Sequence, residues 1–320
     1  MRKLHRTLGR VFFDLFTAVF ALPAGLLLAR ARRGWGYMRL TRKLLYVAGL
    51  FPMRRHYYEP VVYPGDLRKP LDQERDIPGL ELNSAGQLEL LEKFRFADEL
   101  RQIPLHKTGH NAYFHYNGSF EVGDGEFLYS AIRHFKPRRI IEVGSGQSTL
   151  MARLATDRNR TEDDSYDCRQ TCVEPYEQPW LEQTGAEVVR QRVELCDLSL
   201  FDSLERNDIL FIDSSHVIRP QGDVLFECLE VFGRLKPGVI VHVHDIFTPR
   251  DYLTKWIVKD QKLWNEQYLL EAFLCFNDAF RVIGALNWLK HNHPQTLAQA
   301  CPIVGADPAA EPRSFWIVRN

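Results

Sequence analysis

The sequence predicts an α/β fold in which helices flank a doubly wound sheet, with an apolar helical extension at the N-terminus. Short runs of β-branched residues alternate with segments of helical spacing from about Leu88 onward, and such alternation indicates parallel strand pairing. Several of the strand-like runs end in glycine or an acid, as at Gly144 and Asp213. Because ligands bind at the carboxyl ends of strands in such sheets, these residues indicate a binding site.

Composition limits the classes of function. The chain has 320 residues and 45% hydrophobic content, enough for one large domain or a domain with an appendage. Its 41 basic and 41 acidic residues balance, so no general nucleic-acid-binding surface is expected. The six cysteines form no C-x-x-C pair, which favours reduced, buried thiols over a disulfide framework or a zinc site.

The N-terminal segment, residues 1–60, is basic and apolar, and residues 61–120 are predicted to be a linker and cap. Residues 11–29 are apolar apart from Asp14 and Thr17, and their number is within the range of about 17–25 for one bilayer span. A span, a re-entrant hairpin, an interfacial helix and a buried helix all remain open. The basic flanks predict contact with an anionic membrane surface, and so a cytoplasmic protein at the inner face of the cell membrane.

The main domain is predicted to cover residues 121–320, and its elements follow from hydrophobic spacing. The expected helices are 123–135, 148–155, 223–235 and one that begins near Trp264, and the expected strands are 138–145, 169–175, 186–194, 207–216, 236–245, 280–286 and 314–320. Pro137 ends the first of these helices.

The turn in "IIEVGSGQST", residues 140–149, can be compared with three kinds of ligand loop. A phosphate-binding P-loop needs a lysine at the start of the helix, and this turn has none. A dinucleotide fingerprint needs a third glycine where Thr149 stands, which weakens that alternative. The third kind has an acid before the glycines and suits a ligand with a cationic amino acid part and no phosphate.

In this third interpretation each polar residue has a role. Glu142 supplies negative potential beneath the loop, and Gly144 and Gly146 allow the ligand to approach the backbone. Ser148 caps the helix or binds a ligand carboxylate at the helix N-terminus. Glu174, at the end of the second strand, is placed to accept bonds from both hydroxyls of a ribose.

Four motifs resemble the class I S-adenosylmethionine-dependent methyltransferases over roughly residues 120–320. They are "IIEVGSGQST", "CVEP", "DILFIDSSH" and "GVIVHVHDIF", in matching order and spacing. The resemblance implies a seven-stranded Rossmann-like sheet with an antiparallel last strand, S-adenosylmethionine as cofactor, and methyl transfer. The residues expected to bind the cofactor are Glu142, Gly144, Ser145, Gly146, Ser148, Glu174 and Asp213.

A second group of polar residues, Asp213, His216, His244 and Asp245, ends the fourth and fifth strands. It resembles the metal-dependent sugar and catechol O-methyltransferases and the cephalosporin-hydroxylase-like subgroup. The resemblance implies that Asp213 and Asp245 bind a metal and that His216 is a general base. His244 stands where an acidic or amide ligand is expected. One alternative is a metal ion such as Mg, Mn or Zn that is bound by Asp213, Asp245 and His244. The other is a metal-free site in which His216 acts as the base together with Asp213.

The acceptor is expected to be a small molecule or a saccharide-like compound that receives the methyl group on a hydroxyl. The insertion at residues 248–280 carries Tyr252, Trp256 and Trp264, whose aromatic faces suit polar cyclic groups. Residues 110–120 are predicted to cover the cofactor. The alternatives are an NAD(P)-binding oxidoreductase and a membrane-tethered, non-catalytic cofactor-binding protein. The sequence specifies neither the acceptor nor the oligomeric state.

Overall fold

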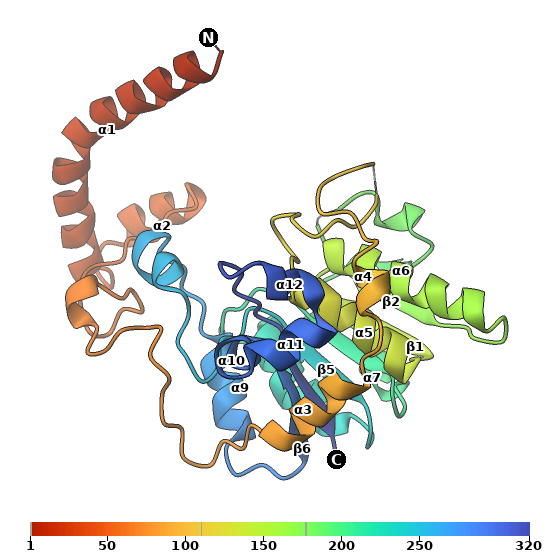
Figure 1. Cartoon of the computed structure of the whole chain (residues 1–320). Helices are drawn as coiled ribbons and strands as arrows, with labels where there is room; N and C mark the ends of the chain where they lie inside the picture. Colours follow the sequence, from red (N-terminus) through yellow and green to blue (C-terminus); the bar gives the residue numbers. More distant parts are fainter. Residues whose placement is uncertain (1, 110, 177) are drawn as a thin grey trace. The chain divides into compact units, whose positions relative to one another are not determined.

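The computed structural model describes residues 2–109, 111–176 and 178–320, which fall into two compact units (Figure 1). One unit comprises the chain up to Arg68 together with Ile257–Leu263. The other comprises Lys69–Trp256 and Trp264–Asn320 and is called the catalytic unit below. Each unit is described by itself.

The N-terminal unit is built on two helices, α1 (Arg2–Arg33) and α2 (Arg39–Val47), followed by a short 3₁₀ turn at Pro64–Asp66. The part of α1 from Gly9 to Arg33 is long and apolar enough to cross a membrane, by length and composition, and its apolar window is not buried. The predicted apolar N-terminal helix is therefore confirmed, and it continues through Pro23.

The catalytic unit contains a seven-stranded sheet in the order β3-β2-β1-β4-β5-β7-β6. The strands are β1 (Arg139–Val143), β2 (Arg169–Val173), β3 (Glu187–Val189), β4 (Ile209–Ile212), β5 (Ile240–Val243), β6 (Phe280–Ala285) and β7 (Phe315–Arg319). All neighbours pair in parallel except β7, which runs antiparallel to β5 and β6. The predicted doubly wound fold with an antiparallel last strand is confirmed.

Alternate side chains of each strand point to opposite faces of the sheet. Both faces are apolar here, and helices cover both of them. Ile140 belongs to one apolar core and its neighbour Ile141 to the other. One face is covered by α3 (Ser84–Lys93), α4 (Ala97–Leu100), α5 (Asp124–Phe135), α6 (Gln147–Glu162), α10 (Leu286–Asn292), α11 (Pro294–Ala300) and α12 (Pro302–Ala306). The other is covered by α7 (Ser199–Asp202), α8 (Asp223–Phe226) and α9 (Glu266–Leu274).

The structure differs from the expected elements in three places. The helix expected at 223–235 is α8 continued by a π segment, Glu227–Val231, and a 3₁₀ turn, Phe232–Arg234. The edge strand β3 stops at Val189, and the rest of the expected strand contains a 3₁₀ turn at Val193–Leu195. Three short helices, α10 to α12, fill the connection from β6 to β7. The remaining short helical turns are Leu181–Gln183 and the π segment Lys255–Lys259.

Candidate active site

The glycine turn after β1 brings three strand ends together. Gly144 has a φ of +76°, a conformation that favours glycine, and a Cβ at this position would overlap the carbonyl oxygen of Asp213. Its N–H donates to the carbonyl of Val173 at 3.1 Å. The turn therefore fits directly against the ends of β2 and β4, and no side chain can be accommodated at residue 144.

Glu142 holds this turn from below. Its buried carboxylate accepts hydrogen bonds from Ser148 Oγ at 2.5 Å, Thr149 Oγ1 at 2.8 Å and Gln170 Nε2 at 3.1 Å. Burial raises the pKa of Glu142 to about 7. Its contacts are thus internal, and it ties the first turn of α6 to the sheet rather than lining the cavity where the cofactor was expected.

Thr149 completes the turn and was not predicted to take part. Its Oγ1 accepts the N–H of Gly146 at 3.0 Å while donating to Glu142. The available signal was its place three residues after Gly146, where a hydroxyl can cap the first turn of a helix. Thr149 therefore holds the start of α6 against β1 by hydrogen bonds. In a dinucleotide-binding fold, a third glycine at this position lets the helix pack closely on the strand.

A cavity of about 580 Å³ lies at the carboxyl ends of β1, β2 and β4, within the range of about 300–1,000 Å³ for small-molecule sites. The predicted residues on its wall are Gly144, Ser145, Gly146, Ser148, Glu174 and Asp213, and the sequence interpretation missed Arg192, Val193, Glu194 and Ser214. Of the predicted cover, Ser119 and Phe120 line the cavity, and residue 110 lies outside the described residues.

The wall of this cavity suits a ligand with hydroxyl, amino and carboxylate groups. The carboxylate of Glu174 accepts the backbone N–H groups of Ser145 at 3.3 Å and Tyr176 at 3.0 Å, so its position at the end of β2 is fixed. Gln147 Oε1 is buried and receives no hydrogen bond from the described residues. No atom lies within 4 Å of a Cβ built at Gly146, which leaves that backbone open. The residues therefore fit S-adenosylmethionine.

Beyond this cavity, Asp213, His216 and Asp245 form a compact group of donor atoms. One ligand atom from each lies within 4.8 Å of the others. His216 Nε2 is 3.2 Å from Asp213 Oδ1 and 3.4 Å from Asp245 Oδ2. His216 and Asp245 both have positive φ, +60° and +58°, and such sparsely populated backbone conformations are found mainly at functional sites.

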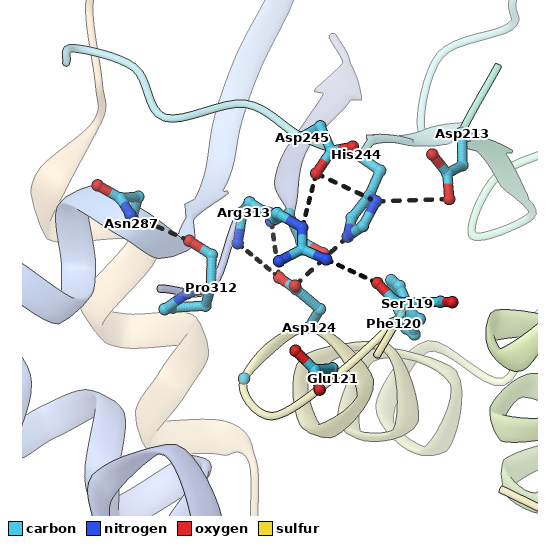
Figure 2. A network of polar contacts seen from close by, with 12 residues as sticks. Ser119, Phe120, Glu121, Asp124, Asp213, His244, Asp245, Asn287, Pro312 and Arg313 are labelled. Carbon is cyan, nitrogen blue, oxygen red and sulfur yellow. Dashed lines mark hydrogen bonds and ion pairs between the residues drawn. The ribbon is translucent and has the colours of Figure 1, made fainter. Parts of the chain in front are cut away.

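Each member of this group has a second polar partner. His216 Nδ1 lies 2.9 Å from Glu266 Oε2. Asp245 Oδ1 is paired with Arg313 Nε at 2.6 Å, and Asp213 Oδ2 lies 3.4 Å from His244 Nδ1 (Figure 2). Arg313 was not predicted, and it also donates through Nη2 to the carbonyl of Ser119 at 2.7 Å.

His244 also lies against both acids, with its Nδ1 3.4 Å from Asp213 Oδ2 and 3.7 Å from Asp245 Oδ1. Its Nε2 is 3.4 Å from Asp124 Oδ2, and Asp124 also accepts the backbone N–H groups of Arg313 and Ser314 at 2.8 Å each (Figure 2). Burial opposes the charge of His244, but Asp213 and Asp245 raise its pKa to about 10. The compact group of donor atoms contains His216 beside the two acids, and the predicted ligand at His244 stays a prediction.

The position of His216 also bears on its predicted role as a base. Burial opposes its charge, but hydrogen bonding to Asp213 and Glu266 holds its pKa well above the ordinary value. A doubly protonated imidazole cannot accept a further proton. Three carboxylates, those of Asp213, Asp245 and Glu266, surround His216. This arrangement suits a bound cation or a protonated imidazole better than a neutral imidazole that acts as a base.

A second cavity, of about 310 Å³, lies on the other side of the segment 119–124. Its wall includes Tyr116, Glu121, Val122, Asp124, Leu253, Asp307 and Arg313. Asp124 and Arg313 therefore face this cavity and also contact the polar group described above. Another cavity, of about 610 Å³, lies over α6; its wall includes Asn111, Ala112 and Tyr113 of the predicted cover but none of the residues predicted to bind the cofactor or a metal.

Comparison with known proteins agrees with this geometry. A family model described as a methyltransferase domain matches residues 141–246. The chain is also 31% identical to an uncharacterised protein from Archaeoglobus fulgidus over 178 residues, 51% of this chain and 77% of that protein. Together with the sheet order, the glycine turn and the cavity above it, the family match supports a class I S-adenosylmethionine-dependent methyltransferase domain in this chain.

Proposed function

We propose that this protein transfers a methyl group from S-adenosylmethionine to a hydroxyl of a small or saccharide-like acceptor, assisted by a divalent metal ion. The observation that carries the proposal is the group of Asp213, His216 and Asp245, each supported by a second polar partner. Metal ligands in proteins are typically oriented by such outer contacts, and a carboxylate behind a ligating histidine is the commonest form.

The spacing and chemistry of the donor atoms suit one small ion. Ligand atoms bound at about 2.1 Å from one ion lie about 3 Å apart, close to the 3.2 and 3.4 Å between His216 Nε2 and the two carboxylates. Glu266 accepts a hydrogen bond from Nδ1–H, which leaves the lone pair of Nε2 to bind an ion. Two carboxylates with one imidazole favour manganese or zinc over magnesium, for which imidazole is a poor ligand.

The cofactor supplies an already activated methyl group, so the chain's main task is to position the reactants. Glu174 would hold the ribose, and the glycine turn at Gly144 and Gly146 would hold the amino acid part. The acceptor would bind beside the Asp213, His216 and Asp245 group, because Asp213 also lines the cofactor cavity. A metal at Asp213, His216 and Asp245 would supply Lewis acidity that lowers the pKa of an acceptor hydroxyl.

The test combines metal content with turnover. The chain is incubated with methyl-labelled cofactor and fractionated cell extract, with and without chelator, and then with magnesium, manganese or zinc in turn. Chelation should abolish labelling, and manganese or zinc should restore it. Asp213→Asn, His216→Asn and Asp245→Asn should each lower bound metal by elemental analysis, whereas His106→Asn, on the exposed surface, should not.

The same experiment separates the metal-free alternative. If His216 acted alone as a base, labelling would persist in excess chelator and would fall by about 10²–10⁴-fold in His216→Asn only. Full activity in chelator with no metal found by elemental analysis would overturn the metal proposal. Failure of every fraction to accept label, with cofactor affinity retained, would instead favour the non-catalytic alternative.

A further inference from the structure

We propose that the N-terminal unit docks on an anionic lipid bilayer, with α1 in the hydrocarbon layer and α2 lying in the plane of the headgroups. This inference concerns the N-terminal unit alone and is independent of the proposed reaction. It rests on the exposure of α1, on the separation of apolar and cationic side chains around α2, and on the aromatic cluster that joins the two helices.

Between residues 11 and 29 the surface of α1 is apolar apart from Asp14 and Thr17, and its apolar window is not buried in the described part of the chain. Nine large apolar side chains between residues 12 and 27 are more than half exposed: Phe12, Phe13, Leu15, Phe16, Val19, Phe20, Leu22, Leu26 and Leu27. The 25 residues Gly9–Arg33 extend over about 37 Å at about 1.5 Å per residue, against a hydrocarbon layer of about 30 Å. The hydroxyl of Thr17 donates to the helix's own carbonyls at 2.9 and 3.0 Å, so it needs no water.

Helix α2 has the pattern of an interfacial helix. Leu40, Leu44 and Val47 follow a spacing of four and three residues and are 61–81% exposed. Arg39, Arg42 and Lys43 line a shallow hollow with Tyr46, and Val47 lies at the border between this cationic side and the apolar side. No residue of α2 is buried. A helix with an apolar face and a separate cationic face binds at the boundary between headgroups and acyl chains.

Charge identifies the kind of membrane. Between Leu15 and Tyr58 the chain has eight Lys or Arg residues and no Asp or Glu. Among these cations, Arg32 is paired with Glu59 at 2.8 Å. Basic residues close to the surface are attracted to an anionic leaflet. The excess of cations on the C-terminal side of α1 places that side in the cytoplasm by the positive-inside rule.

An aromatic cluster joins the two helices at the level expected for the membrane interface. The ring of Trp35, between α1 and α2, packs edge-on against Tyr46 at 5.7 Å and Phe51 at 5.5 Å. The guanidinium of Arg32 lies 4.8 Å from the centre of the Phe51 ring. Tryptophan and tyrosine concentrate at the boundary of a bilayer, because their rings are apolar and carry one polar group.

The test measures amide hydrogen exchange in α2 with the full chain held in lipid nanodiscs. Discs of phosphatidylcholine alone are compared with discs that also contain phosphatidylglycerol. Exchange at residues 39–47 should be about tenfold or more slower in the anionic discs. The triple variant R39Q/R42Q/K43Q should lose this difference, since glutamine keeps helix propensity and removes charge. The control R95Q/R101Q/K107Q, in the catalytic unit, should keep it.

Two results would overturn the proposal. Equal exchange of α2 in both kinds of disc would show that its cations do not meet lipid headgroups. Equal protection in lipid-free detergent would show that α2 is covered by protein, either the catalytic unit or a second copy of the chain. Light scattering of the detergent sample separates those two protein occupants.

Discussion

Glu174 occupies a position at which one side chain can decide cofactor affinity. It lines the cavity at the end of β2, and two backbone amides fix its carboxylate. Because the carboxylate is already oriented, little side-chain entropy is lost when a ligand binds.

We expect Glu174→Ala to weaken binding of S-adenosylhomocysteine by about tenfold or more while the fold is kept. Hydrogen bonds to a charged group contribute about 1.5–3 kcal/mol each, and two ribose hydroxyls would be affected. Isothermal calorimetry on wild type and variant measures the change, with Glu182→Ala, at a glutamate outside the cavity wall, as control. Equal affinity of wild type and Glu174→Ala would remove Glu174 from the site.

Glu142 gives a prediction about pH. Its pKa is raised by burial from 4.5 to about 7, so between these values the unfolded chain releases the proton and the folded chain keeps it. Stability from this group is therefore greatest below about pH 4.5 and is lost as the pH rises to about 7, by up to about 3 kcal/mol.

Glu142→Gln should remove this dependence, since glutamine does not titrate. The free energy of unfolding of wild type relative to the variant should then fall as the pH rises from 4.5 to 7. Urea unfolding at several pH values tests this, with the exposed Glu230→Gln as control. A difference between wild type and variant that is constant with pH would contradict the shift.

At the residue scale the sequence could show which residue types gather at the strand ends, but not which partner each one faces. Asp213, His216 and Asp245 follow strands that any doubly wound sheet places side by side, so their proximity was predictable. Arg313 was not, because it follows a proline-rich stretch with no periodic pattern, and its pairing with Asp245 depends on how β7 enters the sheet. The sequence also did not show that His216 and His244 would both lie against the two acids, His216 at 3.2 Å from Asp213 and His244 at 3.4 Å.

At the scale of elements, the turn between β1 and α6 is where the fold and the site depend on each other. Gly144 fits against the backbone of Asp213, whereas a Cβ at Gly146 meets no atom within 4 Å. The two glycines therefore have separable roles, one in packing and one in leaving room for the ligand.

Gly144→Ala should lower both stability and cofactor affinity. A left-handed conformation costs a non-glycine residue about 1–2 kcal/mol, and the overlap with Asp213 adds to that cost. Gly146→Ala should change stability by less, about 1 kcal/mol at most, but should still weaken S-adenosylhomocysteine binding because its methyl group enters the cavity. Thermal unfolding and calorimetry on the pair separate the two effects, and identical losses of stability would show that the roles are not distinct.

The strand order was predictable because each predicted strand has its own apolar run and its own crossover. The connection from β6 to β7 was not. Its helices α10, α11 and α12 have seven residues or fewer, too few for a helical period to be distinguished from a loop. The signals were Pro294 and Pro302, each at the start of a helix, where proline is favoured.

On the scale of the whole molecule, the apolar cores belong to one unit. Both core clusters, with the side chains packed against them, are drawn from Leu80 to Val318. The N-terminal unit supplies none of these residues, and the large apolar side chains of its helices are mostly exposed, although Ala31 and Ile257 are buried. Residues 1–68 therefore should not be needed for the sheet to fold or for the cofactor to bind.

A shortened chain starting at Lys69 should consequently unfold in a single cooperative transition and bind S-adenosylhomocysteine within about twofold of the full chain. Every residue of the cofactor cavity and of the Asp213, His216 and Asp245 group is retained, and a domain with its own core can fold alone. The same chain should no longer float with anionic vesicles, because the exposed apolar helix and its cations have been removed. Calorimetry, thermal unfolding and vesicle flotation test the three outcomes. Flotation of the shortened chain equal to that of the full chain would locate the lipid-binding surface in the catalytic unit, and loss of cofactor affinity would show that the N-terminal unit supports the site.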